Sequence, residues 1–198
     1  MRFPLITAAL AALCLALPTT AQKVKNYGGD SNRANSTMVL FGENLMAGVV
    51  ISYGQPEWKE DEYKDLDKMI AHYKGNLLRL GKNLWTTFMT SVPITIGGTK
   101  VEAGSYVVGM MLDKDGKFSL ALLDATKAMK KGLMPFGPQK WTPDYLLPLE
   151  LHKDSVKGVV KQMKMSLVSD EQDATHGTFR LVWGTHELTA PLQVHGGE

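Results

Sequence analysis

The sequence predicts a mainly β protein, a single antiparallel β-sandwich of about nine strands covered by one amphipathic helix. Apolar residues alternate with polar ones through most of the chain after residue 37, and turn residues separate these runs. Only one longer segment has a helical period instead. With 44% hydrophobic and 21% charged residues, the composition suits one soluble globular domain. Many short antiparallel strands form either a sandwich or a barrel, and we favour the sandwich.

The first 21 residues have the pattern of a secretory signal peptide. Arg2 precedes an apolar run from Leu5 to Leu17, and small residues lead to Ala21, where a signal peptidase would cut. The run is shorter than the roughly 20 residues of a membrane-crossing helix. We expect an exported protein, periplasmic or extracellular, with no membrane span after cleavage. Cleavage also removes Cys14, the only cysteine, which excludes disulfides and thiol chemistry from the mature chain.

A polar segment separates the predicted signal peptide from the predicted fold. Residues Gln22 to Thr37 are rich in Gly, Asn and Ser and have no period. This composition predicts a flexible leader. The folded domain is therefore expected over residues 38–198.

Each predicted strand rests on a run in which apolar residues alternate or dominate. In chain order the runs are 49–53, 84–92, 94–96, 105–112, 118–122, 147–151, 161–167, 179–183 and 188–194. Gly97-Gly98 is a two-residue hairpin signal, a turn is predicted near Gly184-Thr185, and Asp113–Gly116 predicts a further turn. Pro148 places its strand at an edge of the sheet, because proline has no N–H to give to a ladder.

The segment Lys59 to Tyr73 is the predicted amphipathic helix. Its apolar positions recur at spacings of three, four and three residues: Tyr63, Leu66, Ile70 and Tyr73. These residues share one helical face, and Gly75-Asn76 provides a stop. We expect the helix to cover the sheet or one mouth of the fold. A shorter helical turn is predicted at 126–131, ended by Gly132.

Four stretches of the sequence carry motifs of one protein family: Ile51–Pro56, Leu78–Asn83, Ile96–Tyr106 and Leu181–Gly184. On these motifs the chain resembles the domain-of-unknown-function 2911 (DUF2911) family of exported bacterial proteins. The resemblance covers roughly Val39 to Val194. It implies a single β-rich domain, and it implies no activity that carries over to this chain.

The polar part of the family pattern, Trp-Arg-x-Gly-Ala-Asn-x-Ala-Thr, is kept only in part. The residues that match are Arg79, Gly81, Asn83 and Thr87. The residues that depart from the family's preferences are Gln55, Leu78, Lys82 and Leu84. If the family has a site in this region, these departures indicate that this chain has altered or lost it.

Metal sites, cofactors and nucleic acid are not predicted. The chain has no His-Glu-x-x-His motif, and the turn Asp113–Gly116 lacks the acidic positions of a calcium loop. The methionines occupy positions where alternation already requires apolar side chains, so copper is not needed to explain them. The 22 basic and 20 acidic residues leave no concentrated positive charge for nucleic acid.

Four residues form the candidate ligand-binding site: Tyr53, Trp58, Arg79 and Asn83. They are aromatic, charged or amide residues at strand ends and in loops, where a rigid β-fold usually presents binding groups. Arg79 can hold a carboxylate or phosphate through its planar guanidinium, with Asn83 donating beside it. In the interpretation that we favour for Arg79 itself, the side chain is buried, donates to turn carbonyls and stabilises the fold.

The sequence favours a non-catalytic binding module for a small molecule, glycan or protein. The alternative is an envelope hydrolase with a Ser or carboxylate centre. A Gly-x-Ser-x-Gly motif is absent from the chain, but catalytic triads assemble from remote positions, so this alternative stays open. A histidine within hydrogen-bond reach of both a serine and a carboxylate, inside a cleft, would favour the hydrolase.

Overall fold

The structure is a computed structural model that describes residues 32–41, 46–134 and 140–195. The predicted signal peptide, at 1–21, and the predicted leader up to residue 31 lie outside the described residues. The compact unit that carries the fold begins at Ser31. Along the described part of the chain, no helix is both long and apolar enough to cross a membrane.

Twelve strands among the described residues belong to one antiparallel sheet. They are β1 (Arg33–Phe41), β2 (Met46–Gly54), β3 (Leu77–Arg79), β4 (Thr86–Thr90), β5 (Ile94–Ile96), β6 (Thr99–Val101), β7 (Gly104–Leu112), β8 (Phe118–Asp124), β9 (Tyr145–His152), β10 (Val160–Ser169), β11 (His176–Gly184) and β12 (His186–Val194). Their order in the sheet is β1-β2-β4-β7-β8-β9-β12-β11-β10. β3 pairs with β7, and the β5–β6 hairpin pairs with β12.

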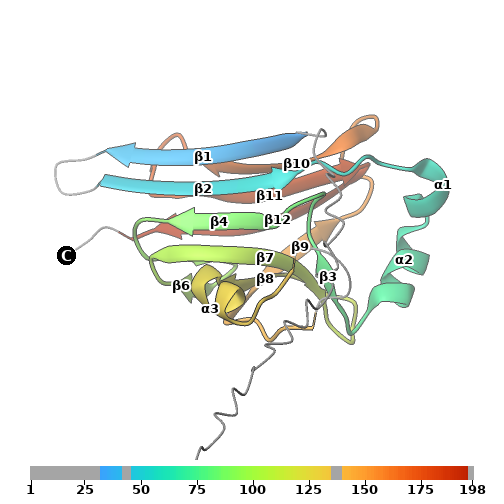
Figure 1. Ribbon diagram of the computed structural model, residues 1–198. Coiled ribbons are helices and arrows are strands. Elements are labelled where there is room, and N and C mark those ends of the chain that lie inside the picture. The colour runs from blue at the N-terminus through green and yellow to red at the C-terminus, as the bar shows by residue number, and fades with distance from the viewer. Residues whose placement is uncertain (1–31, 42–45, 135–139, 196–198) are drawn as a thin grey trace, which may run out of the picture. The chain divides into compact units, whose positions relative to one another are not determined.

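The sheet curves until its first and last strands meet, which nearly closes it into a barrel-like shape (Figure 1). β1 lies against β10. The predicted class, mainly β and antiparallel with few helices, is confirmed. The strands form one continuous sheet rather than two separate layers, because β9 pairs with β8 along one part of its length and with β12 along another.

Side-chain contacts and an isolated β-bridge between Glu57 and Gln162, rather than a continuous backbone ladder, join the two ends of the sheet. The hydroxyl of Tyr53 donates to the carbonyl oxygen of Met165 (3.0 Å) and accepts from its N–H (2.8 Å). The hydroxyl of Ser36 accepts from the N–H of Leu167 (2.9 Å). We call this line of contacts, Ser36 and Tyr53 against Met165 and Leu167, the seam. It satisfies backbone groups that a strand edge would otherwise leave unpaired.

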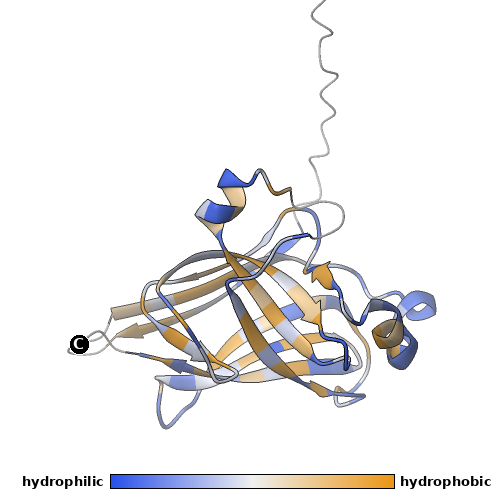
Figure 2. Ribbon diagram, turned by 90° about the horizontal axis from the view of Figure 1, so that it is seen from below, coloured by the Kyte–Doolittle hydropathy of each residue, from blue (hydrophilic) through white to orange (hydrophobic). Residues whose placement is uncertain are grey.

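The runs predicted as strands are confirmed, and alternate residues of these strands fill the interior. Figure 2 shows this alternation of apolar and polar residues along the strands. Val49, Ile51, Phe88 and Phe179 are almost completely buried. A second apolar cluster lies under helix α3 (Ala125–Lys130), where the structure confirms the short helical turn.

Strand β1 corrects the predicted leader. Residues Arg33 to Thr37, which we assigned to the leader, are the first half of β1. Met38 and Leu40 are buried, so the small residues Ala34 and Ser36 share their inward face. The inward positions of this half-strand carry no large apolar side chain, and the period of two is therefore invisible in the sequence.

The predicted amphipathic helix is divided into α1 (Glu60–Tyr63) and α2 (Leu66–Tyr73). Asp65 separates the two helices because its carboxylate accepts from the N–H of Lys68 and caps α2. Leu66, at the start of α2, is buried. The two helices lie beside one open end of the curved sheet (Figure 1), so one of the two predicted locations, the mouth of the fold, is correct.

The hairpin signals are confirmed, but the edge position predicted for Pro148 is wrong. Gly97 and Gly98 have φ angles of 57° and 79° and join β5 to β6. β9, the strand of Pro148, pairs with β8 on one side and with β12 on the other. The ladder to β12 covers only Glu150–His152, so Pro148 lies where that ladder has not begun.

Candidate functional site

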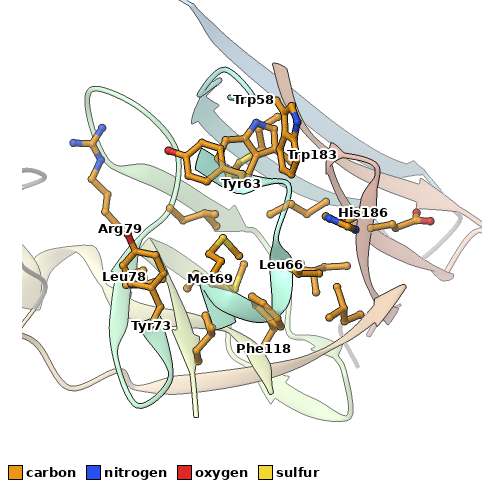
Figure 3. A pocket seen from close by; sticks show the side chains of 18 residues that line it. Trp58, Tyr63, Leu66, Met69, Tyr73, Leu78, Arg79, Phe118, Trp183 and His186 are labelled. Carbon is orange, nitrogen blue, oxygen red and sulfur yellow. The ribbon is translucent and has the colours of Figure 1, made fainter. Parts of the chain in front are cut away.

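A cavity of about 350 Å³ lies at the end of the barrel that α1 and α2 cover (Figure 3). We call it the mouth pocket. Most of its lining is apolar or aromatic and comes from the covering helices and from the ends of seven strands. The lining residues are Trp58, Tyr63, Leu66, Met69, Tyr73, Leu78, Arg79, Leu80, Met110, Leu112, Phe118, Leu151, Met163, Leu181, Trp183, His186, Glu187 and Leu188.

Three aromatic side chains form one wall of the mouth pocket. The ring of Trp183 lies 5.3 Å from that of Trp58 and 4.6 Å from that of Tyr63, measured between centroids. The indole N–H of Trp183 donates to the carbonyl oxygen of Pro56 (3.1 Å), and that of Trp58 donates to the Glu60 carboxylate (2.7 Å). Because both indole N–H groups have partners, this wall offers apolar ring faces to the cavity.

Arg79 is the lining cation. It is the last residue of β3, and its side chain is half-buried. Its guanidinium lies at the rim of the mouth pocket and points away from the apolar side chains (Figure 3). Within the described residues, this guanidinium makes no hydrogen bond and no ion pair. The structural interpretation, in which Arg79 donates to turn carbonyls, is therefore not what the structure shows.

The other two polar residues of the lining are held by neighbours. The Glu187 carboxylate accepts from Nε of Arg180 (2.5 Å). Nδ1 of His186 accepts from the backbone N–H of Asp154 (3.2 Å), which places the proton of the neutral ring on Nε2. The Asp154 carboxylate oxygen lies 3.7 Å from the same Nδ1 but accepts from the Thr185 hydroxyl at 2.6 Å.

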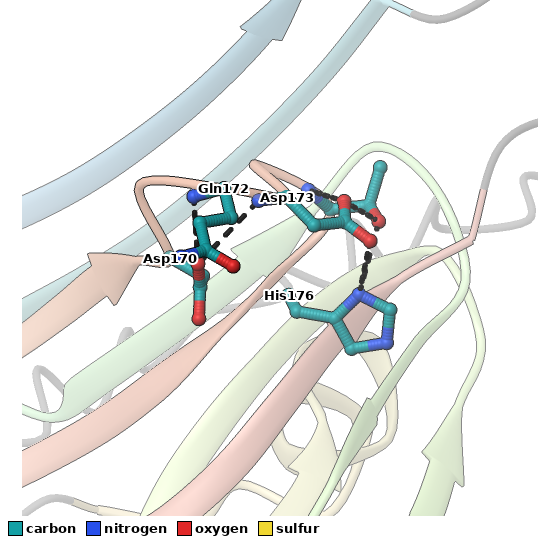
Figure 4. A network of polar contacts seen from close by, with 5 residues as sticks. Asp170, Gln172, Asp173 and His176 are labelled. Atoms are coloured by element: carbon teal, nitrogen blue, oxygen red, sulfur yellow. Dashed lines mark hydrogen bonds and ion pairs between the residues drawn. The ribbon is translucent and has the colours of Figure 1, made fainter.

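Among the described residues, the histidine closest to a carboxylate is His176, which is exposed and begins β11. It lies at the opposite end of that strand from Trp183, which lines the mouth pocket. Nδ1 of His176 lies 2.7 Å from the carboxylate of Asp173, which also accepts from the hydroxyl of Thr175 (2.6 Å; Figure 4). These hydrogen bonds, that from Thr175 above all, hold the pKa of Asp173 below its ordinary value. The network orders the turn between β10 and β11.

No Ser–His–carboxylate arrangement and no metal-binding cluster is found in the part of the chain that the structure describes. There, no histidine side chain bonds to both a serine and a carboxylate: His152 contacts the Thr189 hydroxyl, and His195 contacts that of Thr95. Nor do three His, Cys, Asp or Glu side chains gather around a common point in these residues.

The sequence profile described as "Protein of unknown function (DUF2911)" matches residues 37–192. The chain belongs to the DUF2911 family. No curated protein and no solved structure matches the chain. The matched region of this DUF2911 protein includes every residue that lines the mouth pocket.

The structure of this DUF2911 protein divides the predicted site residues between two regions. Trp58 and Arg79 line the mouth pocket. Tyr53 and Asn83 lie outside its lining. Tyr53 is only 3% exposed and belongs to the seam, and Asn83 lies in the turn after β3 with a φ of 66°.

The matching motif residues of the DUF2911 protein mostly shape this turn. Gly81 has a φ of 84°, and Asn83 is among the residues that tolerate positive φ. The turn packs closely on the end of β2, since a Cβ at Gly54 would lie 2.0 Å from the carbonyl oxygen of Lys82. Of the matching residues up to Asn83, only Arg79 reaches the mouth pocket.

Most of the lining residues were not predicted as part of a site, although several were predicted as inward-facing apolar residues. Tyr63 and Leu66 were assigned to the helix face, and Leu181 and Trp183 to the inward face of a strand. Alternation shows that such residues point inward, but it carries no information about whether the interior there is filled or hollow. His186, directly after the hairpin turn, carried no signal.

Proposed function

We propose that this DUF2911 protein is a non-catalytic binding module that holds a small, mainly apolar molecule in the mouth pocket. The observation that carries the proposal is the cavity of about 350 Å³ with a largely apolar and aromatic lining. Small-molecule sites are typically concave, mostly apolar and have a few polar groups, with volumes from about 300 Å³ upwards. The composition of the lining favours an apolar small molecule over a glycan, which requires many hydrogen-bonding groups.

The same lining supports binding rather than hydrolysis. The described residues that line the mouth pocket include no serine, threonine or cysteine, so they offer no side-chain hydroxyl or thiol of these types as a nucleophile. Its one carboxylate, Glu187, is paired with Arg180. An envelope hydrolase with a Ser or carboxylate centre remains the second candidate, and detection of substrate turnover by the purified protein would establish it.

Export is part of this proposal and rests on the sequence pattern of residues 1–21. A protein that acts outside the cytoplasm is expected to begin near Gln22 when it is recovered from the cell envelope or medium. N-terminal sequencing checks this. Recovery of the intact Met1 in the cytoplasm would overturn it.

Titration with an uncharged fluorescent probe, N-phenyl-1-naphthylamine, tests the binding function. Its emission rises when it enters an apolar site, so we expect a saturable signal with the purified protein. Leu78→Trp places a larger side chain in the mouth pocket and is expected to abolish the signal. Leu84→Trp makes the same change at a side chain that is 58% exposed and outside the lining, and the signal should remain.

Melting temperatures of both variants show whether each is folded. If Leu78→Trp does not fold, Leu151→Phe serves as the second filling variant, because Leu151 lines the mouth pocket and is only half-buried. A wild-type protein without saturable binding would contradict the proposal. So would equal signals from the wild type and a folded filling variant.

A further inference from the structure

The mouth pocket has one charged group without a counter-charge among the residues that the structure describes. The guanidinium of Arg79 makes no ion pair or hydrogen bond there, whereas the lining carboxylate of Glu187 accepts from Arg180. A guanidinium keeps its charge at every physiological pH. The rim of this largely apolar cavity therefore carries one positive charge that no described residue compensates.

Acidic side chains of the covering segment do not supply the missing charge. The Glu62 carboxylate lies 2.7 Å from Nζ of Lys59, and the Glu60 carboxylate accepts from the indole of Trp58. On α2, the Asp67 carboxylate pairs with Lys153, and the Asp65 carboxylate caps the helix. These four carboxylates are already engaged, and Asp61, the remaining acidic residue of α1, makes no ion pair with Arg79. The guanidinium of Arg79 is therefore available to an anion from outside the chain.

The place of Arg79 indicates how such an anion would be oriented. Leu78, the residue before Arg79, lines the cavity, and Tyr73 lies beside it at the same side of the pocket (Figure 3). The guanidinium itself points outward at the rim. A ligand that contacts both must carry its charge at one end, at the rim, and its apolar body inside.

We propose that the ligand of the mouth pocket is an amphipathic carboxylic acid whose carboxylate binds the guanidinium of Arg79. This inference rests on the proposed binding function. The planar fork of guanidinium donors matches a carboxylate and forms two parallel charge-assisted hydrogen bonds. A phosphate monoester would bring a second negative charge, and the described residues of the lining include no lysine and no second arginine to balance it.

Displacement of the uncharged probe by three ligands of eight carbon atoms each tests the inference: octanoic acid, octanamide and octyl phosphate. At pH 7 we expect octanoate to bind at least about tenfold more tightly than octanamide, which has the same shape without the charge. Arg79→Met keeps an apolar stem and should bring octanoate down to the affinity of octanamide. Lys74→Met removes a nearby cation outside the lining and should leave the preference unchanged.

The outcomes separate this inference from the proposed function. If the probe does not bind the wild-type protein, the binding function itself fails. If the probe binds but octanoate and octanamide compete equally, the pocket stands and the carboxylate is excluded. A preference that persists in folded Arg79→Met excludes Arg79 as its source, and tighter binding of octyl phosphate than of octanoate replaces the carboxylate with a phosphate.

Discussion

The seam and the rim of the mouth pocket both present polar side chains near the interior of the barrel, with opposite results. At the seam, Tyr53 and Ser36 bond to the backbone of β10. At the rim, Arg79 has no partner within the described residues. A buried polar group stabilises a fold only when it is paired, whereas an unpaired group at a rim remains free to bind. Stability and recognition are therefore expected to depend on different residues of the candidate set.

The largest effect on stability is expected where the turn after β3 packs on the end of β2. In Gly54→Ala the new Cβ would lie 2.0 Å from the Lys82 carbonyl oxygen, and backbone has to move. We expect a loss of about 3 kcal/mol or more in the free energy of unfolding, measured by denaturant titration. Gly48→Ala is the matched control, because its Cβ would meet only the Ser91 hydroxyl at 4.0 Å. Equal losses in both variants would show that the close packing of Gly54 is not the cause.

Tyr53→Phe removes the hydroxyl of the seam and keeps the ring. It leaves the N–H and carbonyl of Met165 without that partner in a buried position. The expected loss in unfolding free energy is about 1–3 kcal/mol, with probe binding to the folded variant retained. Tyr73→Phe makes the same change at a ring that is 37% exposed and should stay within about 0.5 kcal/mol of the wild type. A Tyr53→Phe protein as stable as the wild type would show that the hydroxyl contacts of the seam do not stabilise the fold.

The smallest effect on stability is expected for Arg79→Met. Its guanidinium contributes no hydrogen bond to the described part of the fold, so the free energy of unfolding should change by no more than about 0.5 kcal/mol. Differential scanning calorimetry of the variant and wild type measures this directly. A loss comparable to that of Tyr53→Phe would end the distinction between the two regions and return Arg79 to a structural role.

Much of the fold was accessible from the sequence because inward residues recur at a period of two. Where that period was absent, the strand was missed: the inward residues of the first half of β1 are Ala34 and Ser36, and β3 has only three residues. The interruption of the predicted helix depended on a single side-chain cap at Asp65. Closure of the sheet was not predictable from the sequence. The seam joins residues that are far apart in the sequence, such as Tyr53 and Met165, and no repeating sequence pattern marks these pairs.

The candidate site was predicted only in part for a similar reason. Trp58 and Arg79 stood out as large or charged residues outside the strand pattern, and the structure brings both to the mouth pocket. Tyr53 was predicted as a binding residue on the same grounds, but its hydroxyl is hydrogen-bonded to the backbone of Met165 in β10. Trp183 followed the alternation of the core and gave no sign that its neighbours leave a cavity. The hydrogen-bond partner of a side chain and the presence of a cavity beside it depend on the tertiary structure, and a local sequence pattern does not predict them.

The seam also has a consequence for self-association of this protein through its strand edges. An uncovered strand edge can pair with a strand of another chain. In this sheet, β1 and β10 are the two ends of the strand order. Because β1 and β10 lie against each other, and because backbone groups of β10 bond to the hydroxyls of Ser36 and Tyr53, the two strand edges cover one another. Any change that parts them uncovers both edges together. Concentration-dependent self-association is therefore the expected first sign of damage at the seam, before the rest of the barrel unfolds.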